Sequence, residues 1–119
     1  MTGVAVLGST GSIGQQTLEV IRAAPDRYEL RGLAAGHANE EFEGQVREWP
    51  QASVWSAEGR PADLPPARWA VGGLEELATA DGVDLVVVAT TGMTALPAVL
   101  AALRAGRRVA LANKETLVA

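Results

Sequence analysis

The amino-acid sequence predicts an α/β domain built as a doubly wound parallel sheet. Short apolar runs alternate along the chain with segments whose apolar residues recur at helical spacing. Hydrophobic residues make up 48% of the chain but aromatic residues only 4%, so the core must consist largely of alanine, valine and leucine. Such a core suits helices packed closely on a parallel sheet. We expect residues 1–119 to form one domain, because 119 residues are enough for a single core.

The first unit is a strand, a glycine-rich turn and a helix. Residues 4–7 are an apolar run that ends at Gly8, and the helix that follows is stopped by Pro25 and Asp26. Residues 28–35 supply a second, mostly apolar strand, which closes one βαβ unit. The helix is indicated by residues at helical spacing, namely Ile13, Thr17, Val20, Ile21 and Ala24.

The middle of the chain predicts a surface helix, a short strand and a loop. Residues 39–49 are acidic, with Phe42 and Val46 four apart and Asn39 in the position of an N-cap. Residues 52–56 form the third strand. Residues 59–66 contain three prolines and are interpreted as a surface loop.

The last part of the chain repeats the alternation. A small helix over residues 74–80 precedes residues 85–89, the clearest buried strand. The next helix has Gly106 as its C-terminal cap, and residues 109–112 form the last strand. The spacing i, i+3, i+4 and i+7 that indicates this helix is carried by Leu96, Val99, Leu100 and Leu103. Ligands of such sheets bind at the carboxyl ends of the strands, so each strand end is a candidate site.

Composition excludes several classes of function. A net charge of −4 provides no basic field for nucleic acid or anionic lipid, which leaves a small molecule as the expected partner. Without cysteine, neither a disulfide scaffold nor a thiolate metal site can form. The apolar run after Met1 is too short for a signal peptide and no stretch reaches transmembrane length, so we expect a cytoplasmic protein.

The strongest motif is GSTGSIG, in which Gly8, Gly11 and Gly14 follow a strand and open a helix. Gly8 allows the tight turn, Gly11 lets the backbone approach a pyrophosphate, and Gly14 lets the helix pack closely on the strand. The amides of residues 10–13 then face the anion at a helix N-terminus. The alternative is that the glycines merely form a turn, which a complete βαβ unit makes the weaker reading.

The end of the second strand favours NADP(H) over NAD(H). An NAD enzyme normally has an acidic residue there for the ribose 2′-hydroxyl, but residues 34–37 are Ala, Ala, Gly and His. Without a carboxylate to repel it, a 2′-phosphate could be bound by His37 and the amides of the Gly36 turn. The alternative for His37 is a solvated loop residue, and Arg60 would contribute only if its loop folds back.

Polar residues also follow the later strands. The segment LANKE, residues 111–115, places an amide, an ammonium and a carboxylate at a strand end, where Lys114 could pair with a substrate phosphate. The alternative is an ordinary turn with Asn113 as an N-cap. Thr90, Thr91 and Gly92 are expected to line the ribose and nicotinamide, or else to form a plain turn.

Together, GSTGSIGQQTLEVI, LAAG and LRAGRRVALANKETLV resemble the 1-deoxy-D-xylulose 5-phosphate reductoisomerases along the whole chain. The resemblance implies a Rossmann-like domain that binds NADPH in an oxidoreductase. That enzyme converts 1-deoxy-D-xylulose 5-phosphate to 2-C-methyl-D-erythritol 4-phosphate in the non-mevalonate isoprenoid pathway. A sugar phosphate as substrate and a homodimeric full-length enzyme are implied in the same way.

The resemblance also implies roles for individual residues. The usual family Asn would stand at Ala38, but this chain has Asn39 one place later, so neither is assigned. Mg²⁺ or Mn²⁺ is implied for the family, with ligands that come after position 119, so we expect the isolated chain to bind NADPH and turn nothing over. The implied cofactor contacts are Thr10, Gly11, Ser12, Ile13, Gly36, His37, Asn113 and Glu115, and the implied substrate contact is Lys114.

Two other functions fit parts of the pattern. One is another NADP-dependent reductase, of the dihydrodipicolinate reductase or semialdehyde dehydrogenase type, which shares the glycine spacing but not LANKE. The other is a non-catalytic nucleotide-binding domain, which the lack of an evident general base or metal cluster would fit equally well.

Overall fold

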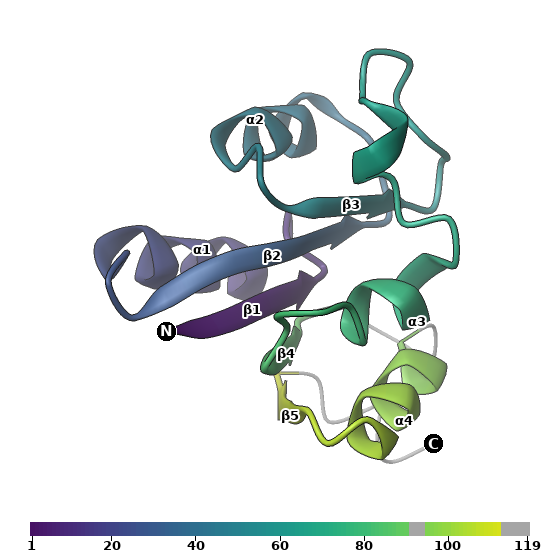
Figure 1. Ribbon diagram of the computed structural model, residues 1–119. Helices are drawn as coiled ribbons and strands as arrows, with labels where there is room; N and C mark the ends of the chain where they lie inside the picture. Colours follow the sequence, from purple (N-terminus) through teal and green to yellow (C-terminus); the bar gives the residue numbers. More distant parts are fainter. Residues whose placement is uncertain (91–94, 113–119) are drawn as a thin grey trace.

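The computed structural model describes residues 1–90 and 95–112, which fold around one parallel sheet (Figure 1). Its strands are β1 (Thr2–Leu7), β2 (Tyr28–Ala35), β3 (Ser53–Ser56), β4 (Leu85–Val88) and β5 (Arg108–Leu111). Their order in the sheet is β3-β2-β1-β4-β5. The chain thus builds outward from β1 in one direction and then in the other, which confirms the doubly wound parallel fold.

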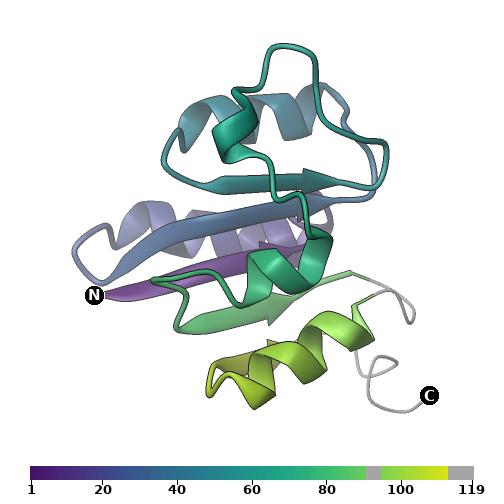
Figure 2. The same ribbon diagram turned by 45° about the vertical axis from the view of Figure 1, so that its right-hand side comes forward.

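The helices alternate with these strands. They are α1 (Ser12–Ala23), α2 (Glu40–Glu48), α3 (Gly73–Ala78) and α4 (Leu96–Arg104), with a short 3₁₀ helix at Pro66–Arg68. Figure 2 shows α1 and α2 behind the sheet and α3 and α4 in front of it. Both faces of the sheet are therefore covered.

The side chains of β1 show how the sheet serves two cores. Val4 and Val6 pack with residues of α1 and α2, whereas Ala5 and Leu7 pack with residues of α3 and α4. This alternation follows from the period of two in a strand. Because both faces are buried, the strand is a continuous apolar run rather than an alternation of apolar and polar residues.

The apolar spacing predicted the positions of α1 and α4 correctly. Some of the residues that indicated the buried face of these helices are, however, exposed. Ile13 and Val20 in α1 are 43% and 58% exposed, and Leu100 and Leu103 in α4 are 43% and 54% exposed. A helix can lie close to a sheet when many of the residues between them are small. Four of the six buried residues of α1 and α4 are Gly, Ala or Val. The residues that these helices bury are Gly14, Leu18, Ile21, Ala98, Val99 and Ala102.

Two predicted helix caps are confirmed. The Asn39 side chain accepts a hydrogen bond of 3.0 Å from the Phe42 amide at the start of α2. After α4, Gly106 has a φ of +77° and its amide donates to the Leu103 carbonyl oxygen. These local signals set where the two helices begin and end.

Candidate functional site

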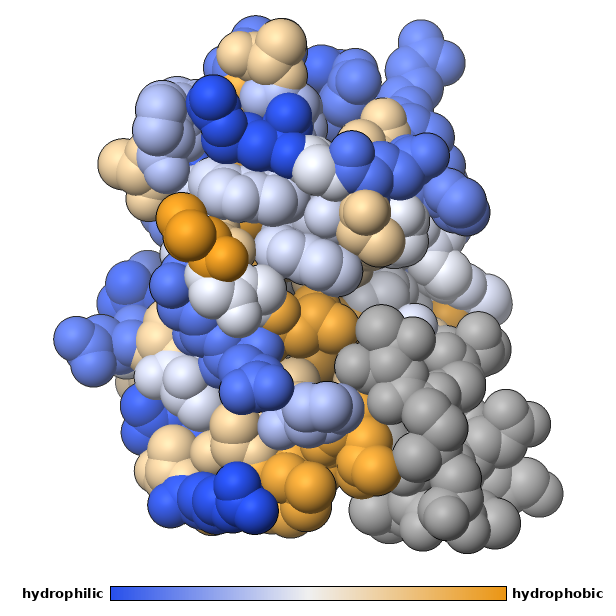
Figure 3. Space-filling model, turned by 90° about the vertical axis from the view of Figure 1, so that its right-hand side faces the viewer, coloured by the Kyte–Doolittle hydropathy of each residue, from blue (hydrophilic) through white to orange (hydrophobic). Residues whose placement is uncertain are grey.

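The candidate site lies at the carboxyl ends of the strands, on the side of the molecule that faces the viewer in Figure 3. The segments that follow β1, β2, β3 and β4 meet there around a cavity of about 150 Å³. Hydrophobic residues, coloured orange, show in the middle of this face in Figure 3. The cavity is at the point where the strand order reverses, which is where doubly wound sheets bind ligands. It is lined by Leu7, Gly8, Ala34, Ala35, Gly36, Trp55, Ala57, Leu74 and Thr90.

Two glycines of the GSTGSIG motif, one in the turn after β1 and one in the first turn of α1, are required by the fold itself. Gly8 has a φ of +93°, and a Cβ there would lie 2.7 Å from the Thr90 amide nitrogen. A Cβ on Gly14 would overlap the carbonyl oxygen of Gly8, because the first turn of α1 packs directly on the loop. A larger residue at Gly8 would push the turn away from the segment after β4, and one at Gly14 would force α1 away from the turn.

Gly11 is different, since the fold leaves room for a side chain at this position. Its φ of −74° and ψ of 170° are open to any residue. A Cβ would meet the Gly8 carbonyl oxygen at 3.7 Å, which is an ordinary van der Waals distance. The space beside Gly11 is therefore free for a ligand that approaches the backbone, as the glycine spacing predicted.

Three backbone amides at the start of α1, next to Gly11 in the chain, have no hydrogen-bond partner among the described residues. Among residues 1–90 and 95–112, the amides of Thr10, Ser12 and Ile13 donate to no other group. No acidic residue lies in the first turn of α1, Ser12–Ala23, so nothing there offsets the positive end of the helix dipole. This arrangement favours an anion such as a pyrophosphate.

The loop is also held by a residue that the sequence analysis did not single out. Gln45 of α2 accepts a hydrogen bond of 2.7 Å from the Ser9 hydroxyl and donates one of 2.9 Å to the Ser9 carbonyl oxygen. Both residues are buried. A signal existed, because Gln45 follows Phe42 by three positions and so shares the buried face of α2.

The end of β2 corrects one step of the sequence analysis. We expected no carboxylate near His37, but Glu58, which follows β3, lies beside it. One oxygen of Glu58 accepts a hydrogen bond of 2.6 Å from the Ala38 amide, and the other is 3.6 Å from Nδ1 of His37. The physical reason is that β2 and β3 are neighbours, so their carboxyl ends bring the following residues together.

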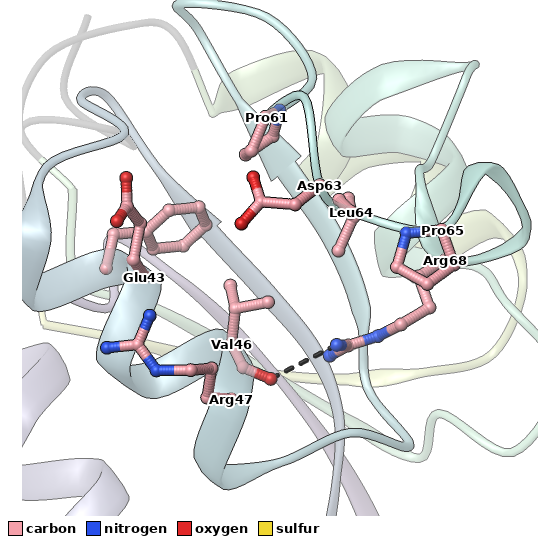
Figure 4. Close-up of a pocket in the computed structure, with 9 residues that line it drawn as sticks. Glu43, Val46, Arg47, Pro61, Asp63, Leu64, Pro65 and Arg68 are labelled. Carbon is pink, nitrogen blue, oxygen red and sulfur yellow. Dashed lines mark hydrogen bonds between the residues drawn. The ribbon is translucent and has the colours of Figure 1, made fainter.

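Arg60 is not directed to this edge of the sheet. Its guanidinium donates to the Leu64 carbonyl oxygen at 2.8 Å and so closes its own loop. That loop and α2 enclose a second cavity of about 140 Å³, shown in Figure 4. Arg68 borders it but is occupied by the carbonyl oxygens of Val46, Trp49 and Ala52. We interpret this cavity as a packing gap beneath the loop.

Other predicted site residues lie outside the described part of the chain. Asn113, Lys114 and Glu115 belong to residues 113–119, and Thr91 and Gly92 to residues 91–94. Thr90 is described and borders the cavity. In residues 1–90 and 95–112 no three acidic or histidine side chains gather as metal ligands would. Nor does any helix there have the length and apolarity to cross a membrane.

Comparison with known proteins shows which family this chain matches. The model of the 1-deoxy-D-xylulose 5-phosphate reductoisomerase family matches residues 4–119. The protein of that name from Moorella thermoacetica is 46% identical over 125 residues, which cover 98% of this chain and 32% of that protein. The one from Pelotomaculum thermopropionicum is 43% identical over 129 residues, covering 100% and 33%. The chain therefore spans about a third of the length of these relatives.

Solved structures agree with this comparison. The 1-deoxy-D-xylulose 5-phosphate reductoisomerase from Zymomonas mobilis in complex with NADPH has a TM-score of 0.80 at 34% identity, covering 98% of this chain and 33% of that one. DOX-P reductoisomerase in complex with NADPH, fosmidomycin and magnesium has a TM-score of 0.82 at 32% identity, covering 99% and 31%. The WlbA dehydrogenase from Bordetella pertussis, at 18% identity and a TM-score of 0.62, shares the fold alone.

Proposed function

The chain belongs to the 1-deoxy-D-xylulose 5-phosphate reductoisomerase family, and from this premise we propose that it binds NADPH where its strands end. The observation that carries the proposal is the free space beside Gly11 together with the unpartnered amides that open α1. Relatives of this chain have been solved with NADPH bound, which supports the choice of ligand.

Several residues would hold the parts of the dinucleotide. The amides of Thr10, Ser12 and Ile13 would donate to the pyrophosphate, where the N-terminus of α1 stabilises negative charge. Gly36 and His37, at the end of β2, would border the adenosine ribose and its 2′-phosphate. Asn113 and Glu115 would contact the cofactor and Lys114 the substrate, which remain predictions from the family resemblance.

The proposed reaction is that of the family enzyme, about a third of whose length this chain spans. That enzyme would rearrange 1-deoxy-D-xylulose 5-phosphate and reduce it to 2-C-methyl-D-erythritol 4-phosphate. NADPH supplies the hydride when bound, and this domain orients it and keeps its pyrophosphate on the loop after β1. The described residues hold no group of three side chains that would fit a divalent cation, so the role proposed for them is to bind the nucleotide. A homodimer and a cytoplasmic location stay predictions.

Titration of the chain with NADPH and NADH tests the proposal. We expect a clear preference for NADPH and no turnover of 1-deoxy-D-xylulose 5-phosphate by the isolated chain, even with Mg²⁺ added. Tighter binding of NADH or of another nucleotide would favour a regulatory nucleotide-binding domain instead. The family match already removes the dihydrodipicolinate reductase and semialdehyde dehydrogenase alternatives.

A further inference from the structure

Glu58 is placed by a turn whose backbone is tied to the sheet. The Glu58 amide donates to Oγ of Ser56 at 3.1 Å, and the amide of Gly59, which has a φ of +97°, donates to the Ser56 carbonyl oxygen. The Ala57 amide donates to the Ala35 carbonyl oxygen at 3.2 Å. Ser56 is buried. The fold therefore fixes the backbone of Glu58 beside the end of β2.

The carboxylate of Glu58 interacts with two groups on the loop after β2. It accepts a hydrogen bond of 2.6 Å from the Ala38 amide and lies 3.6 Å from Nδ1 of His37. The hydrogen bond from the Ala38 amide lowers the pKa of Glu58 below its usual value, so the carboxylate is ionised at neutral pH. An anion thus already sits where our sequence analysis placed the 2′-phosphate.

A 2′-phosphate and a 2′-hydroxyl interact with this carboxylate in opposite ways. A phosphate needs hydrogen-bond donors and is repelled by a second anion, so it would compete with Glu58 for the Ala38 amide and for His37. A hydroxyl can donate to the carboxylate, as in NAD enzymes that have an acidic residue at this place. The side chains of His37 and Glu58 are 79% and 56% exposed, so the carboxylate has room to move aside.

We propose that Glu58 is a specificity-determining residue that limits the preference of this site for NADPH over NADH. The inference rests on the proposed function. In the free protein Glu58 holds the Ala38 amide and faces His37, and binding of a 2′-phosphate displaces it from both. Replacement of Glu58 by glutamine keeps an acceptor for the amide but removes the charge.

The test compares Glu58→Gln with the wild type by titration with NADPH and NADH at low ionic strength. We expect the variant to bind NADPH about two- to fivefold more tightly, the range typical of an exposed charge, and NADH no more tightly than the wild type. The gain should shrink at high salt. Asp26→Asn is the matched control, because Asp26 is exposed in the turn before β2, at the opposite edge of the sheet, and its loss changes the net charge equally.

The outcomes separate this inference from the proposed function. If the wild type binds NADPH but Glu58→Gln leaves the ratio of NADPH to NADH affinity unchanged or lowers it, the role of Glu58 is refuted and the proposed function stands. A gain that Asp26→Asn reproduces would also refute it, since the effect would then come from net charge. If the wild type binds neither nucleotide, the proposed function fails and the inference fails with it. Thermal unfolding of each variant verifies that it is folded.

Discussion

The hydroxyl of Ser9 donates a hydrogen bond of 2.7 Å to Oε1 of Gln45, and Nε2 of Gln45 donates one of 2.9 Å to the Ser9 carbonyl oxygen. Ser9 lies in the glycine-rich loop after β1, and Gln45 lies on α2, 36 positions later. Both are buried, and each satisfies polar atoms of the other. The loop that presents free amides to the candidate site is thereby held by the second helix as well as by the first.

Replacement of Gln45 by leucine should destabilise the protein, because it leaves the buried hydroxyl and carbonyl groups of Ser9 without a partner. We expect a loss of about 1–3 kcal/mol in the free energy of unfolding, measured by urea denaturation. Gln16→Leu is the matched control, since Gln16 is exposed on α1 and its loss should change stability by less than about 0.5 kcal/mol. Equal effects of the two substitutions would show that the buried pair contributes nothing.

Gly11 and Gly14 of the GSTGSIG motif should respond differently to a larger side chain. Gly11→Val should lower the free energy of unfolding by no more than about 1 kcal/mol, since a Cβ has room there and valine is only a poorer N-cap than glycine. Its NADPH affinity should fall on the order of tenfold or more, because the side chain takes the space of the pyrophosphate. An unchanged NADPH affinity would refute the placement of the cofactor.

Gly14→Ala should instead reduce stability, because its Cβ would overlap the carbonyl oxygen of Gly8. The expected loss is about 1–3 kcal/mol in urea denaturation, as for other overpacked sites. A Gly14→Ala protein as stable as the wild type would mean that α1 can shift away from the loop without cost.

The stability of the protein should depend on an arginine at position 68. Its guanidinium donates to the carbonyl oxygens of Val46, Trp49 and Ala52, and Figure 4 shows its approach to Val46. A lysine carries the charge but not the planar fork of donors, so Arg68→Lys should lose about 1–3 kcal/mol of stability. Arg47→Lys, at a neighbouring exposed position, is the control and should change stability little. Equal stabilities of both variants would contradict this role.

The pair of Arg22 and Glu48 should make a small contribution that depends on pH and salt. The hydrogen bond from Arg22 lowers the pKa of Glu48, so the stabilisation is present above the usual value of 4.5 and is lost as the pH falls through the lower pKa of the folded state. The two side chains are 49% and 41% exposed, which limits the effect to less than about 1 kcal/mol.

Urea denaturation of the wild type and Glu48→Gln measures this contribution. The difference in free energy of unfolding between them should be largest near neutral pH in low salt. It should decrease in acid, where the carboxylate is protonated, and in high salt, where the charges are screened. A difference that persists unchanged at pH 3 and in high salt would assign the effect to packing rather than to charge.

The parts of the site that could be predicted from the sequence are those made by neighbouring residues. The glycine spacing indicated a turn, a helix N-terminus and a place for an anion, and Gly11 has the free space that this interpretation requires. The position of Gly36 and His37 at the end of β2 was also correct. The surroundings of His37 were predicted wrongly. Glu58, which accepts a hydrogen bond from the Ala38 amide, comes 20 positions later in the chain.

The order of strands and helices, the glycine-rich turn and the two helix caps were determined by the sequence alone, because each depends on residues a few positions apart. Only the tertiary structure decided that Gln45 reaches Ser9, that Glu58 faces His37, and which side chains of α1 and α4 are buried. These contacts depend on which strands are neighbours and on how each helix is rotated against the sheet. Both are set by the packing of two whole cores, to which every strand and every α-helix contributes.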